Sequence, residues 1–388
     1  MATDVEGIEP TFALVVVSRF PPAHGGAGLR LKRTYKRLSG EGSKISVLTY
    51  GGRGTETGRT TDDIFDVLRV NENFRPILLV FLIMISLIRL RAWRFKSVHV
   101  VGSTVLALIS IFFLKAMGLR VVRELTSDKS MFESNAMVNR LVKVTVRISD
   151  FFMVSKKSTA LQLTDIDVPE EKIWVRINPV DVKDYGLPTA RQREVARSGL
   201  GVSEGSILHL MIGRFRPLKN QILALEALAK MPQNHIVLLA GPVLEEDAAY
   251  YQEVQDKILE YGLEGRVTLI PEFVIDALSL YWAADMYLML STSEGLGNVA
   301  LEALSTGLPV VANHELGLET VVVNGETGLN IPLDLESLVK AMKSYESGNY
   351  LKKRGDISAL SQRKFDANEF DVKTSAVLGL SGRQSTVD

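Results

Sequence analysis

The chain has 388 residues, of which 46% are hydrophobic and 23% charged, and this composition excludes a disordered or fibrous protein. Lys plus Arg equals Asp plus Glu at 45 each, so no global charge points to a nucleic-acid partner. The absence of cysteine excludes disulfides, thiolate metal sites and a cysteine nucleophile. A chain of this length can form two domains, each with its own core.

The first ten residues, MATDVEGIEP, lack the basic start and apolar middle of a signal peptide, so we expect a cytoplasmic protein. The longest apolar run, Ile77 to Ile88, is shorter than the roughly 18 to 20 residues that a spanning helix needs. It predicts a buried helix or a segment that lies on a membrane.

Short β-branched runs alternate with helical periodicity along the whole chain, which is typical of parallel sheets wound with helices. The expected fold class is therefore α/β, with two doubly wound, Rossmann-like domains. In the first half we expect strands at 12–18, 45–50, 98–101, 120–124, 151–154 and 173–177. In the second half we expect them at 207–212, 235–240, 267–270, 286–290 and 310–312.

A polar stretch with Gly186 and Pro188 separates the two series of strands and predicts an interdomain hinge. We expect an N-terminal domain at 1–184, the hinge at 185–198 and a second domain at 199–355. The remainder, 356–388, is expected to be a helical segment that packs back toward the N-terminal domain and ends in a loose tail.

The region from Met286 to Gly307 reads as a short strand, a polar loop STSEGLGN and a helix VALEALSTG. The start of such a helix binds anions, because its first N–H groups lack intrahelical acceptors and the macrodipole adds positive charge. Asn298 is the expected N-cap, and Gly295 and Gly297 allow close approach of a ligand.

Glu294 precedes this helix and Glu302 lies about one turn inside it, so the two carboxylates would meet different parts of one ligand. Ionised carboxylates only accept hydrogen bonds, which suits the hydroxyls of a sugar and a ribose. The spacing alone is equally compatible with a surface helix on which Glu302 is merely solvated.

The run STSEGLGNVALEALSTGLPVVAN resembles the signature of family 4 of the retaining glycosyltransferases, which have the GT-B fold and two glutamates separated by seven residues. HLMIGRFRPLKNQILALEAL resembles the phosphate-binding strand and helix of that family, and VVVNGETGLNIP resembles its following loop. VVVSRFPPAHGGAGLRLKRTYKRL resembles the opening of the family's first domain, although the likeness there is patchier.

The resemblance implies that two cations, Arg214 and Lys219, face a cleft between the domains and stabilise a leaving nucleoside diphosphate. With Glu294 they form the expected catalytic set. The expected donor-binding residues are Gly25, Gly26, Gly295, Leu296, Gly297, Asn298, Val299 and Glu302. The family's mechanism needs no metal, and the five histidines show no metal-ligand spacing.

Many members of the family carry a histidine in the loop after the strand that matches Val121–Leu125, but this chain reads RELTSD there. His24, Glu124 and Thr126 are the candidates to line the acceptor side in its place. Each of them is also compatible with a purely structural role.

The expected reaction is transfer of a sugar from a nucleoside-diphosphate sugar, a co-substrate, to a hydroxyl of a carbohydrate or lipid-linked acceptor, with retention of configuration. Synthesis of a cell-envelope polysaccharide or glycolipid is the expected context, without any other cofactor. The alternatives are a nucleotide-sugar epimerase and a non-catalytic GT-B subunit that binds sugar or membrane.

Basic residues beside apolar segments raise the question of peripheral attachment to an anionic membrane surface. One cluster follows the apolar run in RLRAWRFK, and another lies on the first helix at Arg30, Lys32, Arg33, Lys36 and Arg37. Ordinary solvated helix faces would give the same pattern.

Overall fold

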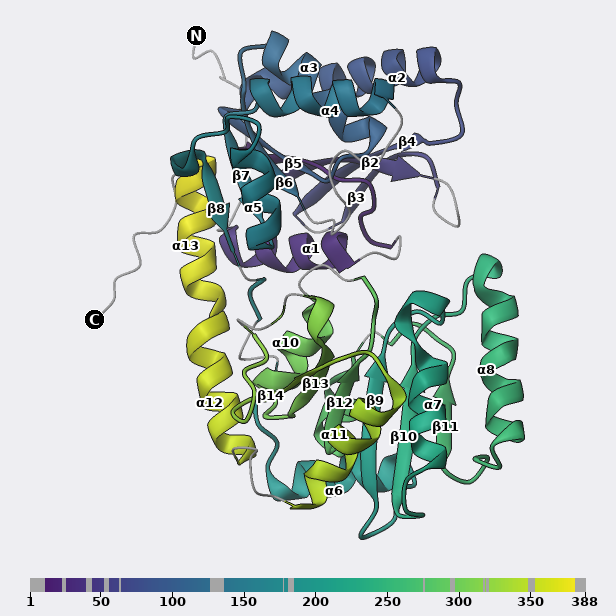
Figure 1. The fold of residues 1–388 in the computed structure, drawn as a ribbon. Helices are drawn as coiled ribbons and strands as arrows, with labels where there is room; N and C mark the ends of the chain where they lie inside the picture. The colour runs from purple at the N-terminus through teal and green to yellow at the C-terminus, as the bar shows by residue number, and fades with distance from the viewer. Residues whose placement is uncertain are drawn as a thin grey trace, which may run out of the picture. The chain divides into compact units, whose positions relative to one another are not determined.

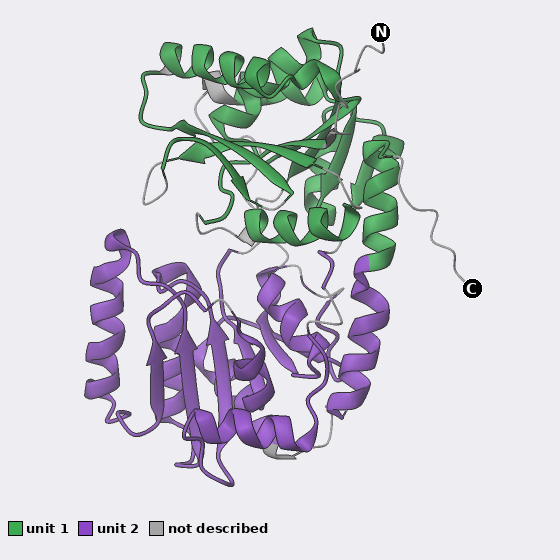
Figure 2. Ribbon diagram, turned by 180° about the vertical axis from the view of Figure 1, so that it is seen from behind, with its two compact units in different colours: residues 1–177, 368–388 green, residues 178–367 purple. Residues whose placement is uncertain are grey.

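The computed structural model divides into two compact units, residues 1–177 with 368–388 and residues 178–367, coloured separately in Figure 2. The structure describes residues 11–22, 26–39, 44–51, 56–62, 64–125, 136–176, 178–180, 185–274, 276–293, 297–316, 318, 321–347 and 353–380. Each unit is an α/β body built on one sheet, as the alternating pattern of strands and helices predicts.

Unit 1 contains an eight-stranded sheet in the order β3-β4-β2-β1-β5-β6-β7-β8. Its strands are β1 (Thr11–Val16), β2 (Lys44–Gly51), β3 (Gly58–Asp62), β4 (Phe65–Asn71), β5 (Ser97–Val101), β6 (Arg120–Leu125), β7 (Phe151–Val154) and β8 (Ile173–Val175). All neighbours pair in parallel except β3, which runs antiparallel to β4 at one edge.

The helices of unit 1 cover both faces of this sheet (Figure 1). They are α1 (Gly26–Leu38), α2 (Pro76–Arg89), α3 (Val105–Ala116), α4 (Ala136–Ile148), α5 (Lys157–Thr164) and α13 (Ala367–Leu378), with short 3-10 helices at Ala92–Arg94 and Glu170–Lys172. Side chains alternate across a strand, so Leu14 and Val16 pack under α2 and α3 while Val15 packs under α1 and α13. Both faces of the sheet are therefore buried.

Unit 2 contains a six-stranded, fully parallel sheet in the order β11-β10-β9-β12-β13-β14. Its strands are β9 (Ile207–Ile212), β10 (His235–Ala240), β11 (Val267–Ile270), β12 (Met286–Met289), β13 (Val310–Asn313) and β14 (Gly328–Ile331). Counted within the unit, this is the doubly wound order 3-2-1-4-5-6, in which the direction of winding reverses between β9 and β12.

Helices from α6 to α12 belong to unit 2. They are α6 (Ala190–Gly199), α7 (Gln221–Ala229), α8 (Ala248–Glu260), α9 (Leu278–Ala283), α10 (Asn298–Ser305), α11 (Leu335–Ser347) and α12 (Arg354–Phe365), with 3-10 helices η3 (Pro217–Lys219), η4 (Glu245–Asp247) and η5 (His314–Leu316). One core lies between α7, α8, α11 and one face of the sheet.

The segment expected as a hinge contains α6, a helix with a capping box formed by Thr189 and Gln192. Arg193 and Arg197 of this helix form ion pairs with Asp285 at 2.5 and 3.0 Å. These contacts place α6 inside unit 2. The chain changes unit at residues 177–178 and returns at 367–368, where α13 joins unit 1.

Three cationic residues of α1 form ion pairs within unit 1. Arg30 pairs with Glu124, Lys32 with Asp62 at 2.5 Å, and Arg37 with Asp371 at 2.7 Å. A lipid surface attracts cations that lack such internal counter-ions, so these three ion pairs weigh against a membrane-binding role for α1, which stays a prediction.

Two histidines stack in the core of unit 2, and they predict a pH-dependent stability. His209 Nε2 lies 2.9 Å from His235 Nδ1, the rings are 12° from parallel, and both side chains are fully buried. Burial, with a smaller contribution from His235, lowers the pKa of His209 to about 3.

Because the unfolded chain takes up this proton near pH 6.5 and the folded chain does not, His209 favours folding above pH 6.5 and progressively less as the pH falls toward 3. We expect the free energy of unfolding of the wild type, relative to a His209→Phe variant, to fall by roughly 1.4 kcal/mol per pH unit at most below pH 6.5. Urea unfolding of both proteins at pH 7, 6 and 5 measures this difference. A difference that stays constant over these pH values would contradict the assignment.

Candidate donor site at the carboxyl ends of strands β9 and β12

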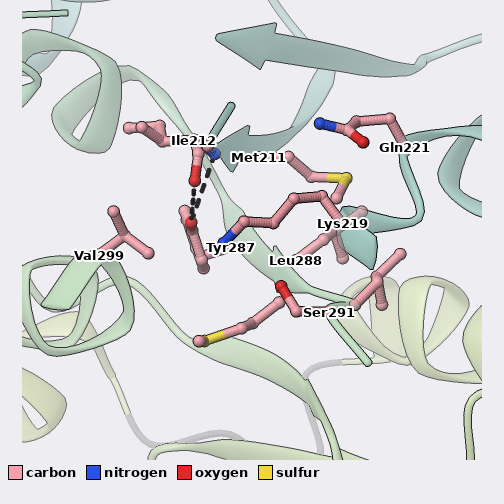
Figure 3. A pocket seen from close by; sticks show the side chains of 11 residues that line it. Met211, Ile212, Lys219, Gln221, Tyr287, Leu288, Ser291 and Val299 are labelled. Atoms are coloured by element: carbon pink, nitrogen blue, oxygen red, sulfur yellow. Dashed lines mark hydrogen bonds between the residues drawn. The ribbon is translucent and has the colours of Figure 1, made fainter. Parts of the chain in front are cut away.

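The candidate site lies at the carboxyl ends of β9 and β12, where the winding of the sheet reverses. Parallel sheets bind ligands at this switch point, because the loops on either side diverge and leave a crevice. A pocket opens there, shown in Figure 3. Its lining residues are Met211, Ile212, Gly213, Lys219, Gln221, Tyr287, Leu288, Met289, Leu290, Ser291 and Val299.

A tyrosine of β12 is hydrogen-bonded to the last residue of β9 at the pocket. The hydroxyl of Tyr287 donates to the carbonyl of Ile212 at 3.0 Å and accepts from its N–H at 3.3 Å (Figure 3). On the other side of β9, a Cβ at Gly241 would lie 2.2 Å from the carbonyl oxygen of Gly213. Glycine is therefore required for β9 and β10 to end this close together, and the crevice has a rigid floor.

Lys219 brings a cation into this pocket. It is the last residue of η3, and Figure 3 shows its side chain extending into the pocket on the side of Tyr287. The same side chain crosses Gly213, where an added Cβ would come within 3.3 Å of Lys219 Cε. Gly213 thus leaves the room that the lysine needs, and the phosphate-binding role of Lys219 stays a prediction.

Arg214, the second predicted cation, points toward carboxylates at the start of α8. It pairs with Asp247, and its Nη2 lies 2.9 Å from Glu246. Burial alone lowers the pKa of Arg214, but the hydrogen bonds to Asp247 and Glu246 outweigh it and raise the pKa. Arg214 is not among the described residues that line the pocket.

Amide side chains tie the loop after β12 to its neighbours. Asn220 donates to the carbonyl of Leu290 at 2.8 Å, and Asn313 donates to that of Ser291 at 3.0 Å. The N–H of Thr292 donates to the carbonyl of Leu218 at 2.9 Å. The described beginning of the loop is therefore held by the segment around η3 and by the end of β13, before the segment that carries Glu294.

Helix α10 begins beside the pocket, and Val299 in its first turn lines it. Gly297 precedes the helix with φ 54°, a left-handed conformation that favours glycine. Gly297 is thus the N-cap, and Asn298 is the first helical residue, which corrects the sequence expectation by one position. The side chain of Asn298 instead accepts a hydrogen bond from Asn178 at 2.5 Å.

Glu302 lies on α10 and is held by a buried tyrosine. The Tyr281 hydroxyl donates to Glu302 Oε2 at 3.0 Å, and Tyr281 is fully buried. Burial and the nearby charge of Glu302 raise the pKa of Tyr281, so its hydroxyl keeps the proton that it donates. The hydrogen bond fixes one oxygen of Glu302, while a carboxylate retains further acceptor positions for a ligand.

Several candidates lie outside the described residues: His24 and Gly25, Thr126, and the loop residues Glu294, Gly295 and Leu296. Their assignments stay predictions. Gly26 is the first residue of α1.

Glu124, a candidate for the acceptor side, is instead the centre of a buried ion cluster in unit 1. It has no exposed surface, and its Oε1 pairs with Arg30 and, at 2.5 Å, with Arg176. His99 Nε2 lies 3.1 Å from Glu124 Oε2, and the Tyr35 hydroxyl lies 3.0 Å from His99 Nδ1. A carboxylate enclosed in this way has a structural role and does not contact an acceptor.

Among the described residues, no three His, Cys, Asp or Glu side chains gather in a way that could hold a metal ion. None of the described helices has the length and apolar character needed to cross a membrane.

Sequence reasoning missed the residues that shape the site without carrying charge. Tyr287 and Tyr281 lie within short apolar segments, where a tyrosine reads as core. Asn220 could have been found, because an asparagine just before a helix readily adopts the left-handed conformation that it has here, with φ 56°.

Solved structures share this fold over nearly the whole chain. HepE of Anabaena in complex with UDP matches with a TM-score of 0.79 at 20% identity, covering 95% of this chain and 100% of that one. Sucrose-phosphate synthase from Thermosynechococcus elongatus matches with a TM-score of 0.81 at 18% identity, covering 95% and 98%. At these identities the likeness establishes the fold alone, which is GT-B.

Sequence comparison adds relatives and a family. D-inositol 3-phosphate glycosyltransferase of Mycobacteroides abscessus is 31% identical over 189 residues, 47% of this chain and 41% of the relative. The same enzyme of Rhodococcus jostii is 33% identical over 162 residues, 39% and 36% of the two chains. The chain thus spans about two fifths of the curated relatives it matches. The family described as glycosyl transferases group 1 matches residues 192–362, which include the pocket, Lys219 and α10. Residues 192–362 thus resemble the group 1 glycosyltransferases, and the whole chain has the GT-B fold.

Proposed function

We propose that this chain is a retaining glycosyltransferase that moves a sugar from a nucleoside-diphosphate sugar to an acceptor hydroxyl. The observation that carries the proposal is the position of Lys219 beside the start of α10, in the pocket at the switch point of a group 1 domain. A cation and a helix N-terminus at one crevice suit a diphosphate, because both place positive charge where the leaving oxygens become negative.

Each part of the donor would contact a different group of residues. Lys219 and Arg214 would meet the diphosphate; for Arg214, the Nη1 group lies outside its two carboxylate pairs. Glu302, with one oxygen fixed by Tyr281, would accept hydrogen bonds from the ribose hydroxyls. Glu294 and the backbone from Gly295 to Asn298 would hold the sugar.

On this proposal the bond between the sugar C1 and the diphosphate oxygen breaks, and its electron pair leaves with the nucleoside diphosphate. The acceptor oxygen bonds to C1 on the same face, and its proton passes to the departing phosphate oxygen. No enzyme carboxylate forms a covalent intermediate and no metal takes part, because cationic side chains supply the charge at the leaving group.

The relatives support a choice of donor and acceptor. Structures of HepE of Anabaena hold UDP and UDP-glucose, and the curated relatives bear the name D-inositol 3-phosphate glycosyltransferase. We therefore propose a UDP-sugar donor and a polyol, carbohydrate or lipid-linked acceptor, in the synthesis of a cell-envelope polysaccharide or glycolipid.

Proton NMR of the protein with a UDP-sugar and a panel of acceptors tests the proposal. We expect UDP release that depends on the acceptor, with the anomeric configuration of the donor kept in the product. A donor that changes into its epimer without any acceptor would identify an epimerase. A donor that raises the thermal stability of the protein without being turned over, even by slow hydrolysis, would identify a non-catalytic binding subunit.

A further inference from the structure

Helix α2 of unit 1 exposes an apolar face that no described element covers. Five large side chains of this helix are between 44% and 76% exposed: Ile77, Leu78, Phe81, Ile85 and Ile88. Ile77 and Leu78 are adjacent, and the others follow at intervals of three or four residues, so the set lies along one side of the helix. The opposite side, which includes Ile83 and Leu87, is buried against the sheet and α3. A surface helix normally turns polar residues to water, so the outer face of α2 is an exposed apolar patch of the kind that marks an interaction site.

One cation precedes this patch in the sequence and four follow it. Residues 73–96 contain five cations and no aspartate or glutamate, although the whole chain has no net charge. These cations are Arg75, Arg89, Arg91, Arg94 and Lys96. All five are exposed, and none forms an ion pair with another described residue. Trp93, also exposed, lies among them. We call residues 75–96 with these side chains the α2 surface.

The neighbouring helices extend the α2 surface. Helices α2, α3 and α4 form one layer on the same face of the unit 1 sheet (Figure 1). α3 exposes Phe112, and α4 exposes Leu141 and Val144 together with Arg147. The outer side of the layer therefore combines apolar and cationic side chains over more than one helix.

We propose that the α2 surface docks unit 1 on an anionic phospholipid membrane, with α2 lying in the plane of the interface. A helix of 14 residues is about 21 Å long, too short to cross a hydrocarbon core of roughly 30 Å. Ile77, Phe81 and Ile85 enter the boundary of the acyl chains, while the arginines at the ends contact lipid phosphates. Trp93 lies at the polar boundary, where an indole ring is favourable.

The charge distribution favours a membrane over a second copy of this chain. A two-fold symmetric dimer through α2 would bring ten cations together with no acidic residue of the segment to balance them. Apart from Arg89 at its end, the exposed side chains of α2 itself are aliphatic or phenyl groups, which offer no hydrogen bonds for a polar rim of the kind that protein interfaces have. Lipid tails need none.

Vesicle flotation of the full chain, without donor or acceptor, tests this proposal independently of any transferase activity. We expect binding to vesicles of phosphatidylcholine with 30% phosphatidylglycerol at 50 mM NaCl, and much weaker binding at 500 mM NaCl or to pure phosphatidylcholine. Ile77→Ser with Phe81→Ser should weaken binding at least about tenfold. Arg89→Gln, Arg94→Gln and Lys96→Gln together should do the same.

Matched controls separate the α2 surface from general surface properties. Leu161→Ser with Leu259→Ser removes two side chains that are each 63% exposed elsewhere. The second control replaces three exposed cations of unit 2, Arg191, Lys230 and Lys340, by glutamine. It removes as much charge as the triple variant of the α2 surface. Both control sets should bind within about twofold of the wild type. Brominated lipid should quench Trp93, with a loss of quenching in Trp93→Phe.

The proposal is overturned if the wild type does not bind the anionic vesicles or if the control sets lose as much binding as the α2 variants. It is also overturned if light scattering shows a dimer that Ile77→Ser with Phe81→Ser converts to a monomer while vesicle binding is unchanged. In that case the surface is an interface between copies of the chain.

Discussion

Replacing Lys219 by alanine is expected to lower kcat for sugar transfer by about 10² to 10³ fold, with a smaller change in KM for the donor. Loss of one preorganised group that stabilises charge in the transition state has this magnitude. The negative charge of the leaving diphosphate grows as the bond to the sugar breaks, so a cation in the pocket binds the transition state more strongly than the ground state. Steady-state rates of UDP release at saturating acceptor measure both constants.

Lys230→Ala is the matched control, because it removes the same charge from the exposed end of α7. It should leave kcat within about twofold of the wild type. Lys219→Arg should recover only part of the activity, since a guanidinium differs from an ammonium in size and geometry. A Lys219→Ala enzyme that keeps kcat and loses only donor affinity would show that Lys219 binds ground and transition states equally, which contradicts its proposed role at the leaving group.

Most of the central strands could be predicted from the sequence, because buried parallel strands are continuous apolar runs. The predicted ranges 151–154, 207–212, 235–240 and 267–270 agree with β7, β9, β10 and β11 at both ends. These apolar runs alternate with segments of helical periodicity, and that alternation predicts the α/β class.

Three strands were missed, and each lacks that pattern. β3 is the sequence GRTTD, which is fully exposed at the sheet edge and has no apolar residue. β4 contains Arg69, whose guanidinium is buried but donates to Thr60 and to the carbonyl of Pro21. β14, within the segment read as a loop, has four residues that include Gly328, where a Cβ would lie 1.9 Å from the carbonyl oxygen of Val310. Contacts with residues far away in the sequence determine that these segments form strands.

At the candidate site the sequence identified charged residues but not their partners. Lys219 lines the pocket, whereas Arg214 faces Asp247 and Glu246, which follow it by more than thirty residues. Glu124 reads as a polar residue at the end of a strand. Its burial depends on Arg30 and Arg176, which come from distant parts of the chain. Pairing between residues far apart in sequence follows from the tertiary fold and leaves no local signal.

Replacing Glu124 by glutamine is expected to destabilise unit 1 by roughly 3 to 5 kcal/mol, because it leaves Arg30 and Arg176 buried without their shared counter-ion. Burial alone raises the pKa of Glu124, but Arg176, Arg30 and the hydrogen bond with His99 outweigh it and hold the pKa well below its usual range. The ionised cluster therefore stabilises unit 1 above the unfolded pKa of Glu124, and this stability is lost as the pH falls through the folded pKa.

Urea unfolding in a Trp282→Phe background isolates this effect, because Trp93 and Trp174 then report on unit 1 alone. Glu171→Gln, the same change at an exposed position of unit 1, should shift the free energy of unfolding by less than about 0.5 kcal/mol. Adding Arg30→Met to Glu124→Gln should restore part of the loss, since it removes one of the two stranded charges. A Glu124→Gln protein as stable as the Glu171→Gln control would show that the buried arginines reach solvent or another anion, and that Glu124 does not hold the core of unit 1 together.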